Sequence, residues 1–211
     1  MLIITSGMIG SGKTTLTDRM AKHFNSRPFF EPVGDNPVLP LYYADPKRYG
    51  FLLQIFFLNK RFKMIKRALN APHNILDRSI YEDALFTKQN HLDGNISDSE
   101  WDVYQGLLNN MLDDLNAIPQ AHPNLLVYVY TDFDTVLKRI KKRGRAFEQI
   151  DAHPELKDYY YRLWQAYQTW FAEYDKSPKV KIDLQTYDLS DPDNLPIVLS
   201  QIDAAVTKYK I

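Results

Sequence analysis

The segment from Gly7 to Thr14 reads Gly-Met-Ile-Gly-Ser-Gly-Lys-Thr and matches the pattern G-x-x-x-x-G-K-[ST]. Its glycines let successive backbone N–H groups turn inward around phosphate oxygens, and a helix that begins here adds positive potential. Lys13 supplies a mobile cation for the outer phosphates, and the Thr14 hydroxyl suits Mg²⁺. We therefore predict a nucleoside-triphosphate site formed by Gly7, Met8, Ile9, Gly10, Ser11, Gly12, Lys13, Thr14 and Thr15.

Charged residues follow two short apolar segments, and they suit the acceptor side of a transfer reaction. Glu31 comes after Phe29-Phe30, and Asp77-Arg78 comes after Ile75-Leu76. In open α/β sheets, ligands bind outside the carboxyl ends of strands. There Glu31 would accept a proton from an attacking hydroxyl, Asp77 would suit Mg²⁺, and Arg78 would suit the phosphoryl group. Taken alone, the same residues equally fit a surface acid and a helix cap beside a solvated arginine.

An amide and a guanidinium lie on one face of a predicted long helix. Gln54 is the only polar residue between Phe51 and Leu58, and Arg61 lies two turns later on the same face. A buried amide must be hydrogen-bonded, and this pair suits the edge of a nucleobase. The alternative is that Gln54 bonds to the backbone and that Arg61 lies in solvent.

The segment Lys138–Arg145 is strongly basic, with six Lys or Arg residues in eight. Such a run fits a solvated helix face or a nucleic-acid patch. Beside a phosphate loop, it also fits a lid that clamps triphosphate oxygens, with Gly144 as a hinge. Composition alone leaves these three interpretations open.

Strands and helices alternate along the chain, which predicts an α/β protein. We expect strands at 2–5, 28–30, 74–77, 125–131 and 180–184, and helices at 14–24, 46–69, 80–89, 97–116, 132–143, 155–174 and 194–209. Residues 32–46 contain four prolines and predict a loop, and Pro72 should end the helix before it. The strands are almost uniformly apolar, so the sheet should be parallel and covered on both faces. The aromatic residues of 155–174, Tyr167 included, are expected in the core or an interface.

The composition limits the class of protein. A chain of 211 residues fits one domain, here 1–211. Lys plus Arg equals Asp plus Glu at 26 each, so overall charge attracts neither nucleic acid nor membrane. There is no cysteine, and no apolar run approaches the roughly 18 residues of a membrane helix. We expect a soluble, cytoplasmic protein without a signal peptide.

Five segments together resemble one family. They occur in the right order and spacing: the phosphate loop, Glu31-Pro32-Val33, Tyr42-Tyr43-Ala44-Asp45-Pro46 with Gln54, the stretch from Asp77-Arg78-Ser79 to Asp83, and Lys142-Arg143-Gly144-Arg145 with Glu148. The chain resembles the deoxyribonucleoside kinases, most closely the bacterial deoxyadenosine, deoxyguanosine and deoxycytidine kinases. The resemblance implies a P-loop NTPase-like, five-stranded parallel sheet with helices on both faces.

The resemblance also implies a role for each matching position. Glu31 would be the general base for the 5′-hydroxyl, with Lys13 and Arg78 as the other catalytic residues. Mg²⁺ would be held by Thr14 and Asp77, directly or through water. The substrate would be bound by Glu31, Tyr43, Gln54, Arg61, Arg78, Asp83 and Glu148, of which Tyr43 and Glu148 bond the 3′-hydroxyl. Arg139, Arg143 and Arg145 would be lid arginines, in a lid formed by about residues 139–150.

The expected activity is ATP-dependent 5′-phosphorylation of a deoxynucleoside in nucleotide salvage. We expect deoxyadenosine as the acceptor, with deoxycytidine and deoxyguanosine as alternatives. The expected partners are these small molecules and a second chain, in a homodimer or a heterodimer with a related kinase. Two other functions stay open: a nucleotide-binding subunit of a heteromeric kinase, and a nucleoside monophosphate kinase. Glu31 disfavours the second because it would repel an acceptor phosphate.

Overall fold

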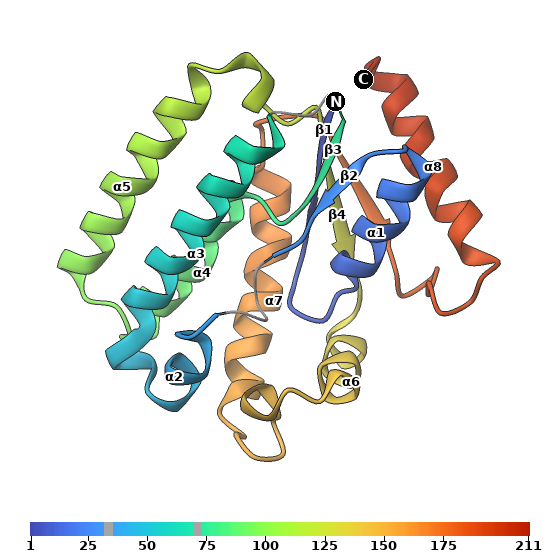
Figure 1. Ribbon diagram of the computed structural model, residues 1–211. Coiled ribbons are helices and arrows are strands. Elements are labelled where there is room, and N and C mark those ends of the chain that lie inside the picture. Colours follow the sequence, from blue (N-terminus) through green and yellow to red (C-terminus); the bar gives the residue numbers. More distant parts are fainter. Residues whose placement is uncertain (32–35, 70–72) are drawn as a thin grey trace.

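Five parallel strands form a sheet in the order β2-β3-β1-β4-β5 in the computed structural model, which describes residues 1–31, 36–69 and 73–211 (Figure 1). The strands are β1 (Leu2–Ser6), β2 (Arg27–Phe29), β3 (Asn74–Asp77), β4 (Leu125–Tyr130) and β5 (Lys179–Asp183). Each begins and ends within one residue of its predicted range. The predicted five-stranded parallel sheet is confirmed.

Alternate residues along the strands pack against opposite faces of the sheet. Ile75 and Val127 pack with α1 and α8, whereas Leu76 and Leu126 pack with α3 and α5. In Figure 1, α3, α4 and α5 lie on one side of the strands, and α1 and α8 lie on the other. Because both faces are buried, the strands are apolar throughout rather than alternating with polar residues.

Helices connect the strands. They are α1 (Lys13–His23), α2 (Leu39–Ala44), α3 (Pro46–Ala68), α4 (Ile80–Leu92), α5 (Asp98–Asn116), α6 (Phe133–Arg143), α7 (Leu156–Glu173) and α8 (Asn194–Tyr209), with 3-10 turns η1 (Pro119–Ala121) and η2 (Ala146–Glu148). In the described part of the chain, no helix is both long and apolar enough to span a membrane. Pro32, Val33 and Pro72, named in the predictions above, lie outside the described residues.

The prediction of a loop over residues 32–46 is wrong for α2. The Oδ1 atom of Asn36 accepts hydrogen bonds from the backbone N–H groups of Val38, at 2.9 Å, and Leu39, at 3.1 Å. Pro40 lies in the first turn of the helix, where its missing N–H costs nothing. An asparagine before a helix and a proline inside its first turn are signals for the start of a helix. The four prolines of this segment, taken together, favour a loop instead.

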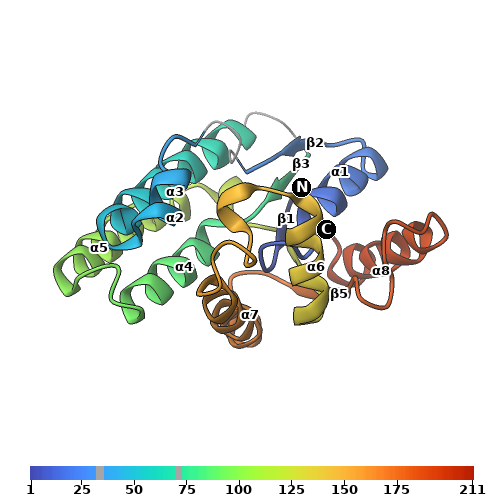
Figure 2. The ribbon, with the colours of Figure 1, turned by 90° about the horizontal axis from the view of Figure 1, so that it is seen from below.

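The carboxyl ends of all five strands lie at one edge of the sheet, the lower edge in Figure 1. Seen from below in Figure 2, α6 lies across this edge, and η2 connects it to α7. Asp132 starts α6 by accepting a hydrogen bond from the N–H of Thr135 at 2.9 Å, and Gly144 ends it with a left-handed φ of 71°. The basic segment is thereby placed above the phosphate loop.

Candidate active site

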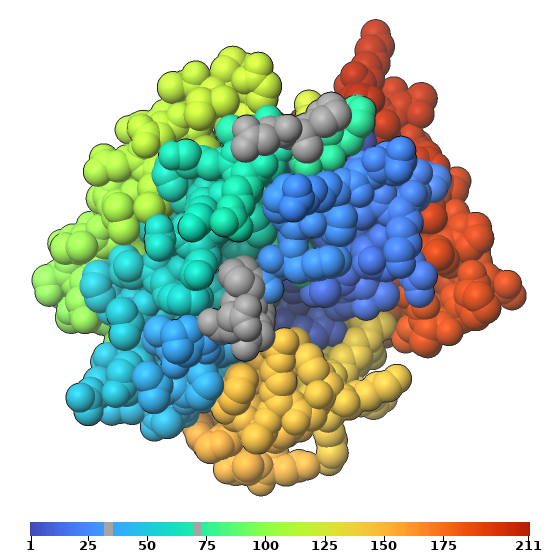
Figure 3. Space-filling model, in the orientation of Figure 1, coloured from blue at the N-terminus to red at the C-terminus, as the bar shows by residue number. Residues whose placement is uncertain are grey.

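A cavity of about 680 Å³ lies at the carboxyl ends of the strands. In Figure 3 the molecule is hollowed here, between the yellow lid and the blue N-terminal segment. The predicted site residues that line it are Ile9, Gly10, Gly12, Lys13, Thr14, Thr15, Glu31, Tyr43, Gln54, Asp77, Arg78, Asp83, Arg139, Arg143, Arg145 and Glu148. Four other predicted residues lie behind this lining: Gly7, Met8, Ser11 and Arg61.

The phosphate loop turns sharply between β1 and α1. Gly7 has a φ of 143°, and a Cβ atom there would lie 2.4 Å from the carbonyl oxygen of Val129, so only glycine fits. The Met8 side chain is buried in the core, and its carbonyl oxygen accepts a hydrogen bond from Lys13 Nζ at 2.7 Å. α1 begins at Lys13, so its N-terminus faces the cavity with the positive end of the helix dipole.

Lys13 is buried near other charges. Burial, and then the positive charge of Arg78, lower the pKa of Lys13 from its ordinary 10.5 to about 7, although Asp77, Glu82 and Glu31 act in the opposite direction. A bound anion would stabilise the ammonium form. The side chain is therefore suited to gain charge when triphosphate oxygens enter the cavity.

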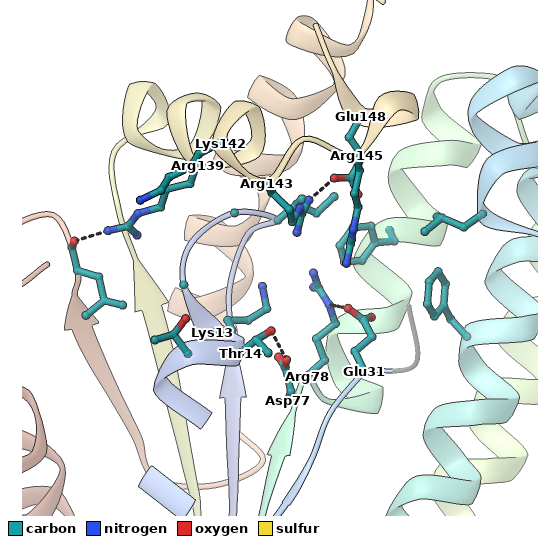
Figure 4. Close-up of a pocket in the computed structure, with 18 of the residues that line it drawn as sticks. Lys13, Thr14, Glu31, Asp77, Arg78, Arg139, Lys142, Arg143, Arg145 and Glu148 are labelled. Carbon is teal, nitrogen blue, oxygen red and sulfur yellow. Dashed lines mark hydrogen bonds and ion pairs between the residues drawn. The ribbon is translucent and has the colours of Figure 1, made fainter. Parts of the chain in front are cut away.

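Glu31 lies between two guanidinium groups. Its Oε1 atom accepts a hydrogen bond from Arg61 Nη2 at 2.9 Å. Its Oε2 atom accepts one from Arg78 Nε at 2.9 Å (Figure 4). Burial favours a raised pKa, but Arg78, and then Arg61 and Lys13, outweigh it and hold the pKa of Glu31 at about 2. The carboxylate is therefore ionised and can accept a hydrogen bond from a substrate hydroxyl.

Arg78 directly follows β3 with a left-handed φ of 77°, a strained value for a residue with a side chain. Its Nη1 atom donates hydrogen bonds to Glu82 at 2.7 Å and to the carbonyl oxygen of Gly7 at 3.4 Å. Burial opposes the charge, but Glu31 raises the pKa of Arg78 well above its ordinary value. A permanent cation therefore lies between the predicted base and the phosphate loop (Figure 4).

Thr14 and Asp77 come together beside the loop. The Thr14 hydroxyl donates a hydrogen bond to Asp77 Oδ2 at 2.6 Å, whereas Asp77 Oδ1 is buried without a partner among the described residues. Mg²⁺ prefers oxygen ligands, and a carboxylate oxygen without a partner beside a hydroxyl provides them. The described residues contain no cluster of three or more His, Cys, Asp or Glu that could hold a metal alone. These two residues therefore fit a cation that takes its other ligands from phosphates and water.

Gln54 from α3 and Asp83 from α4 line another part of the cavity, with Phe57 beside them. The Thr87 hydroxyl donates to Gln54 Oε1 at 3.4 Å. Arg61 lies behind Asp83, with only 2% of its surface exposed, and pairs with the Asp83 carboxylate through Nε and Nη2 at 3.0 Å each. The amide and the carboxylate thus present polar atoms to a ligand, while the arginine holds the carboxylate from behind.

Glu148 lies in η2, within the predicted lid, and lines the cavity. It accepts hydrogen bonds from Arg143 and, at 3.2 Å, from Arg145 (Figure 4). Tyr43 packs its ring against Phe147, with the ring centroids 5.2 Å apart. Burial raises the pKa of Tyr43 well above its ordinary value, so its hydroxyl keeps its proton. Both predicted ligands of a 3′-hydroxyl thus line the cavity, Glu148 from the predicted lid and Tyr43 from α2.

Arg139 joins three segments. It donates hydrogen bonds to the carbonyl oxygen of Ser11 at 2.8 Å, the carbonyl oxygen of Leu184 at 3.1 Å and the carboxylate of Asp188 at 3.1 Å. The base of the lid is thereby tied to the phosphate loop and to the segment after β5. That segment lines the cavity through 184 and 188–190.

Several lining residues were not predicted as site residues. Lys142 belongs to the basic segment of the predicted lid, but the resemblance assigns it no role. The others are mainly apolar or aromatic: Leu39, Tyr42, Leu53, Phe86, Tyr159, Leu184 and Leu189, with Asp188 and Ser190. By type, the apolar ones cannot be told from core residues, and only the folded chain shows which of them face a ligand.

Comparison with known proteins agrees with this geometry. The family model described as deoxynucleoside kinase matches residues 3–206. The deoxyguanosine kinase of Lactobacillus acidophilus is 50% identical over 202 residues, covering 95% of this chain and 89% of that protein. The deoxyadenosine kinase of the same organism is 49% identical over 183 residues, covering 86% and 85%.

A solved structure of deoxyadenosine kinase from M. mycoides with bound dATP has a TM-score of 0.80 and 29% identity, covering 96% of this chain and 100% of that one. Another, with bound dCTP, has a TM-score of 0.80 and 27% identity, covering 97% and 100%. Family, sequence relatives and fold therefore agree, and the chain belongs to the deoxynucleoside kinase family.

Proposed function

We propose that this phosphotransferase moves the γ-phosphoryl group of ATP to the 5′-hydroxyl of a deoxynucleoside, with deoxyadenosine as the expected acceptor. The observation that carries the proposal is the place of Glu31. It lies in the cavity that Lys13 also lines, with Arg78 beside it. A hydroxyl bound to Glu31 would face phosphates held by the loop, as in-line transfer requires.

Positioning and charge neutralisation would supply most of the rate, because the transition state of phosphoryl transfer is loose. Lys13 and the lid arginines Arg143 and Arg145 would neutralise the triphosphate. Arg78 would contact the phosphoryl group in transfer. A carboxylate with a pKa of about 2 is a weak base, so Glu31 would mainly orient the hydroxyl and accept its proton late.

We infer that Mg²⁺ binds with ATP beside Thr14 and Asp77. Among the described residues, Asp77 Oδ1 has no hydrogen-bond partner, and it lies beside the Thr14 hydroxyl, which supports this assignment. Bound there, the ion would supply positive charge that offsets the negative charge of the triphosphate.

The nearly equal identities to a deoxyguanosine kinase and a deoxyadenosine kinase support a purine acceptor, but do not choose between the two. Gln54 and Asp83 offer an amide and a carboxylate to the polar edge of the base. We keep deoxyadenosine as the expected acceptor, with deoxyguanosine and deoxycytidine as alternatives.

An assay with radiolabelled ATP and each of the four deoxynucleosides tests the proposal, with dAMP as a fifth acceptor. We expect labelled monophosphate from at least one purine deoxynucleoside, and no labelled diphosphate from dAMP. The Glu31→Gln variant is the matched control, because it keeps the shape of the side chain but removes the base. No product with any deoxynucleoside, or product from dAMP alone, would contradict the proposal.

The dimer and the cytoplasmic location remain predictions. Light scattering of the purified chain, alone and with a related kinase, tests the first, and cell fractionation tests the second. Turnover by the purified chain alone would also exclude a role as a mere partner subunit.

A further inference from the structure

One carboxylate next to the phosphate loop has no role in the proposed reaction. Glu82 lies one turn into α4 with none of its surface exposed. It does not line the cavity, as far as the described residues show. Burying a carboxylate is costly unless it is paired and fully hydrogen-bonded. Its partners therefore indicate what it does.

Three donors from three elements converge on Glu82. Ser6, the last residue of β1, donates a hydrogen bond to Oε2. Arg78 Nη1 donates to Oε1 at 2.7 Å, and the hydroxyl of Tyr167 on α7 donates to the same atom at 3.1 Å. Arg78 Nη1 also donates to the Tyr167 hydroxyl, so carboxylate, hydroxyl and guanidinium form a closed triangle.

The triangle fixes one end of the Arg78 guanidinium. Nε is bonded to Glu31, and Nη1 is bonded to Glu82 and Tyr167. The guanidinium carbon lies 4.8 Å from the centroid of the Phe86 ring, which supports one face of the group. Nη2 has no hydrogen-bond partner in the described part of the chain, and Arg78 lines the cavity. The atom left free is therefore the one available to a ligand.

Arg78 would act on the reaction only through the position of its charge, so rigid placement of the guanidinium matters. Arg78 follows β3 with a left-handed backbone, and an arginine side chain without partners would populate many rotamers. A charge held in advance at the phosphoryl position avoids reorganisation during the reaction. A free arginine would lose that advantage.

We propose that Glu82, together with Ser6 and Tyr167, is a positioning element that fixes Arg78 with Nη2 directed at the transferring phosphoryl group. This inference rests on the proposed kinase reaction. Arg78 would then be held by two carboxylates: Glu31, which lines the cavity, and Glu82, which does not.

Steady-state kinetics of Glu82→Gln and Tyr167→Phe test the inference. Both variants keep the side-chain shape and remove part of the triangle. We expect kcat to fall on the order of 10- to 100-fold in Glu82→Gln and about tenfold in Tyr167→Phe. The KM values for ATP and deoxynucleoside should change less than about threefold, because the loss falls in the transition state.

A double-mutant cycle separates positioning from simple folding support. In an Arg78→Lys background, Glu82→Gln and Tyr167→Phe should cause almost no further loss of kcat, because the ammonium cannot be held at two points. The control is Tyr174→Phe, which removes another buried hydroxyl, bonded to Ser177 at the end of α7. It should leave kcat unchanged.

Equal losses of kcat with and without Arg78 would overturn the inference, as would wild-type kcat in the folded Tyr167→Phe variant. If Glu82→Gln does not fold, the Tyr167→Phe cycle alone decides. If the proposed function itself is wrong, the wild-type protein will phosphorylate no deoxynucleoside. That result is distinct from a failure of this inference, which appears only in the variants.

Discussion

Arg61 and Asp83 form a two-point ion pair inside the protein, with Arg61 Nε and Nη2 each 3.0 Å from a carboxylate oxygen. The Arg61 side chain is only 1% exposed, and it also bonds to Glu31. Two carboxylates thus depend on one buried cation. The pair joins α3 to α4 and holds both the predicted base and the predicted base-reading acid in place.

Loss of Arg61 alone should destabilise the fold. Arg61→Met leaves Asp83 without its partner in the interior, and breaking a buried pair typically costs about 3–5 kcal/mol of unfolding free energy. Arg61→Met combined with Asp83→Ala removes both charges and should recover part of that loss. Urea unfolding measures the effect. Arg67→Met, on an exposed position of the same helix, is the control and should stay within about 0.5 kcal/mol of wild type. Equal stabilities of the single and double variants would contradict the argument.

The same pair should control which base enters. The Asp83 carboxylate lines the cavity and repels the carbonyl oxygens of thymine. Arg61→Met with Asp83→Ala should therefore raise kcat/KM for thymidine by at least tenfold and lower it for purine deoxynucleosides. If the double variant folds and its kcat/KM for thymidine is unchanged, the pair does not determine which base is accepted.

Lys13 should take up a proton when ATP binds. With a pKa of about 7 in the free protein, it is about 90% neutral at pH 8 and about 10% neutral at pH 6. Triphosphate oxygens favour the ammonium form, so the affinity for ATP should fall as the pH rises above 7. Calorimetry with a non-hydrolysable ATP analogue in two buffers of different ionisation enthalpy should show uptake approaching one proton at pH 8. Lys142→Met, which changes another lysine of the cavity, should preserve the uptake. No uptake at pH 8 would show that Lys13 is already charged.

Glu31 should remain ionised at any pH at which the protein is assayed. Its pKa of about 2 lies below the ordinary 4.5, so its contribution to stability is complete above about pH 4.5 and is lost as the pH falls toward 2. We therefore expect no loss of kcat from protonation of this residue between pH 5 and 8. Glu31→Gln should lower kcat by about 10²- to 10⁴-fold and leave ATP binding nearly unchanged. An acid limb near pH 6 in the wild type that disappears in Glu31→Gln would contradict the low pKa.

Much of this arrangement could be predicted from the sequence, because it depends on local patterns. The apolar strands, the phosphate loop and the charged residues after β2 and β3 each lie within a few consecutive positions. Their meeting at one edge follows from the parallel sheet. Arg61 shows the limit: helical periodicity placed it on the face of Gln54, but its direction depends on Asp83, which lies on another helix.

The roles of Tyr167 and α2 required the folded chain. Tyr167 has the type and spacing of a core residue, and its ring is buried as expected. Its hydroxyl reaches Arg78 only because α7 crosses behind the phosphate loop, a contact between residues 89 apart in sequence. No local pattern contains that information. α2, in contrast, has local start signals in Asn36 and Pro40, although the number of prolines in this segment favours a loop.

Glu148 should couple the lid to the acceptor. Its carboxylate bonds to Arg143 and Arg145 and lines the cavity with Tyr43. A 3′-hydroxyl bonded to Glu148 would therefore help to hold the lid arginines over the triphosphate. Wild-type protein should use a 2′,3′-dideoxynucleoside with a kcat/KM about 10- to 100-fold below that of the deoxynucleoside, since the site is left with unpaired polar groups.

In Glu148→Gln, that ratio between the two acceptors should shrink, and the KM for ATP should rise because the lid is less well fixed. Competition kinetics with the two acceptors measures the ratio directly. Tyr43→Phe provides the matched comparison. It removes a predicted 3′-hydroxyl ligand that makes no ion pair with the lid, so it should reduce the ratio without raising the KM for ATP. An equal rise in the KM for ATP in both variants would show that the lid responds to the acceptor side as a whole and not through Glu148.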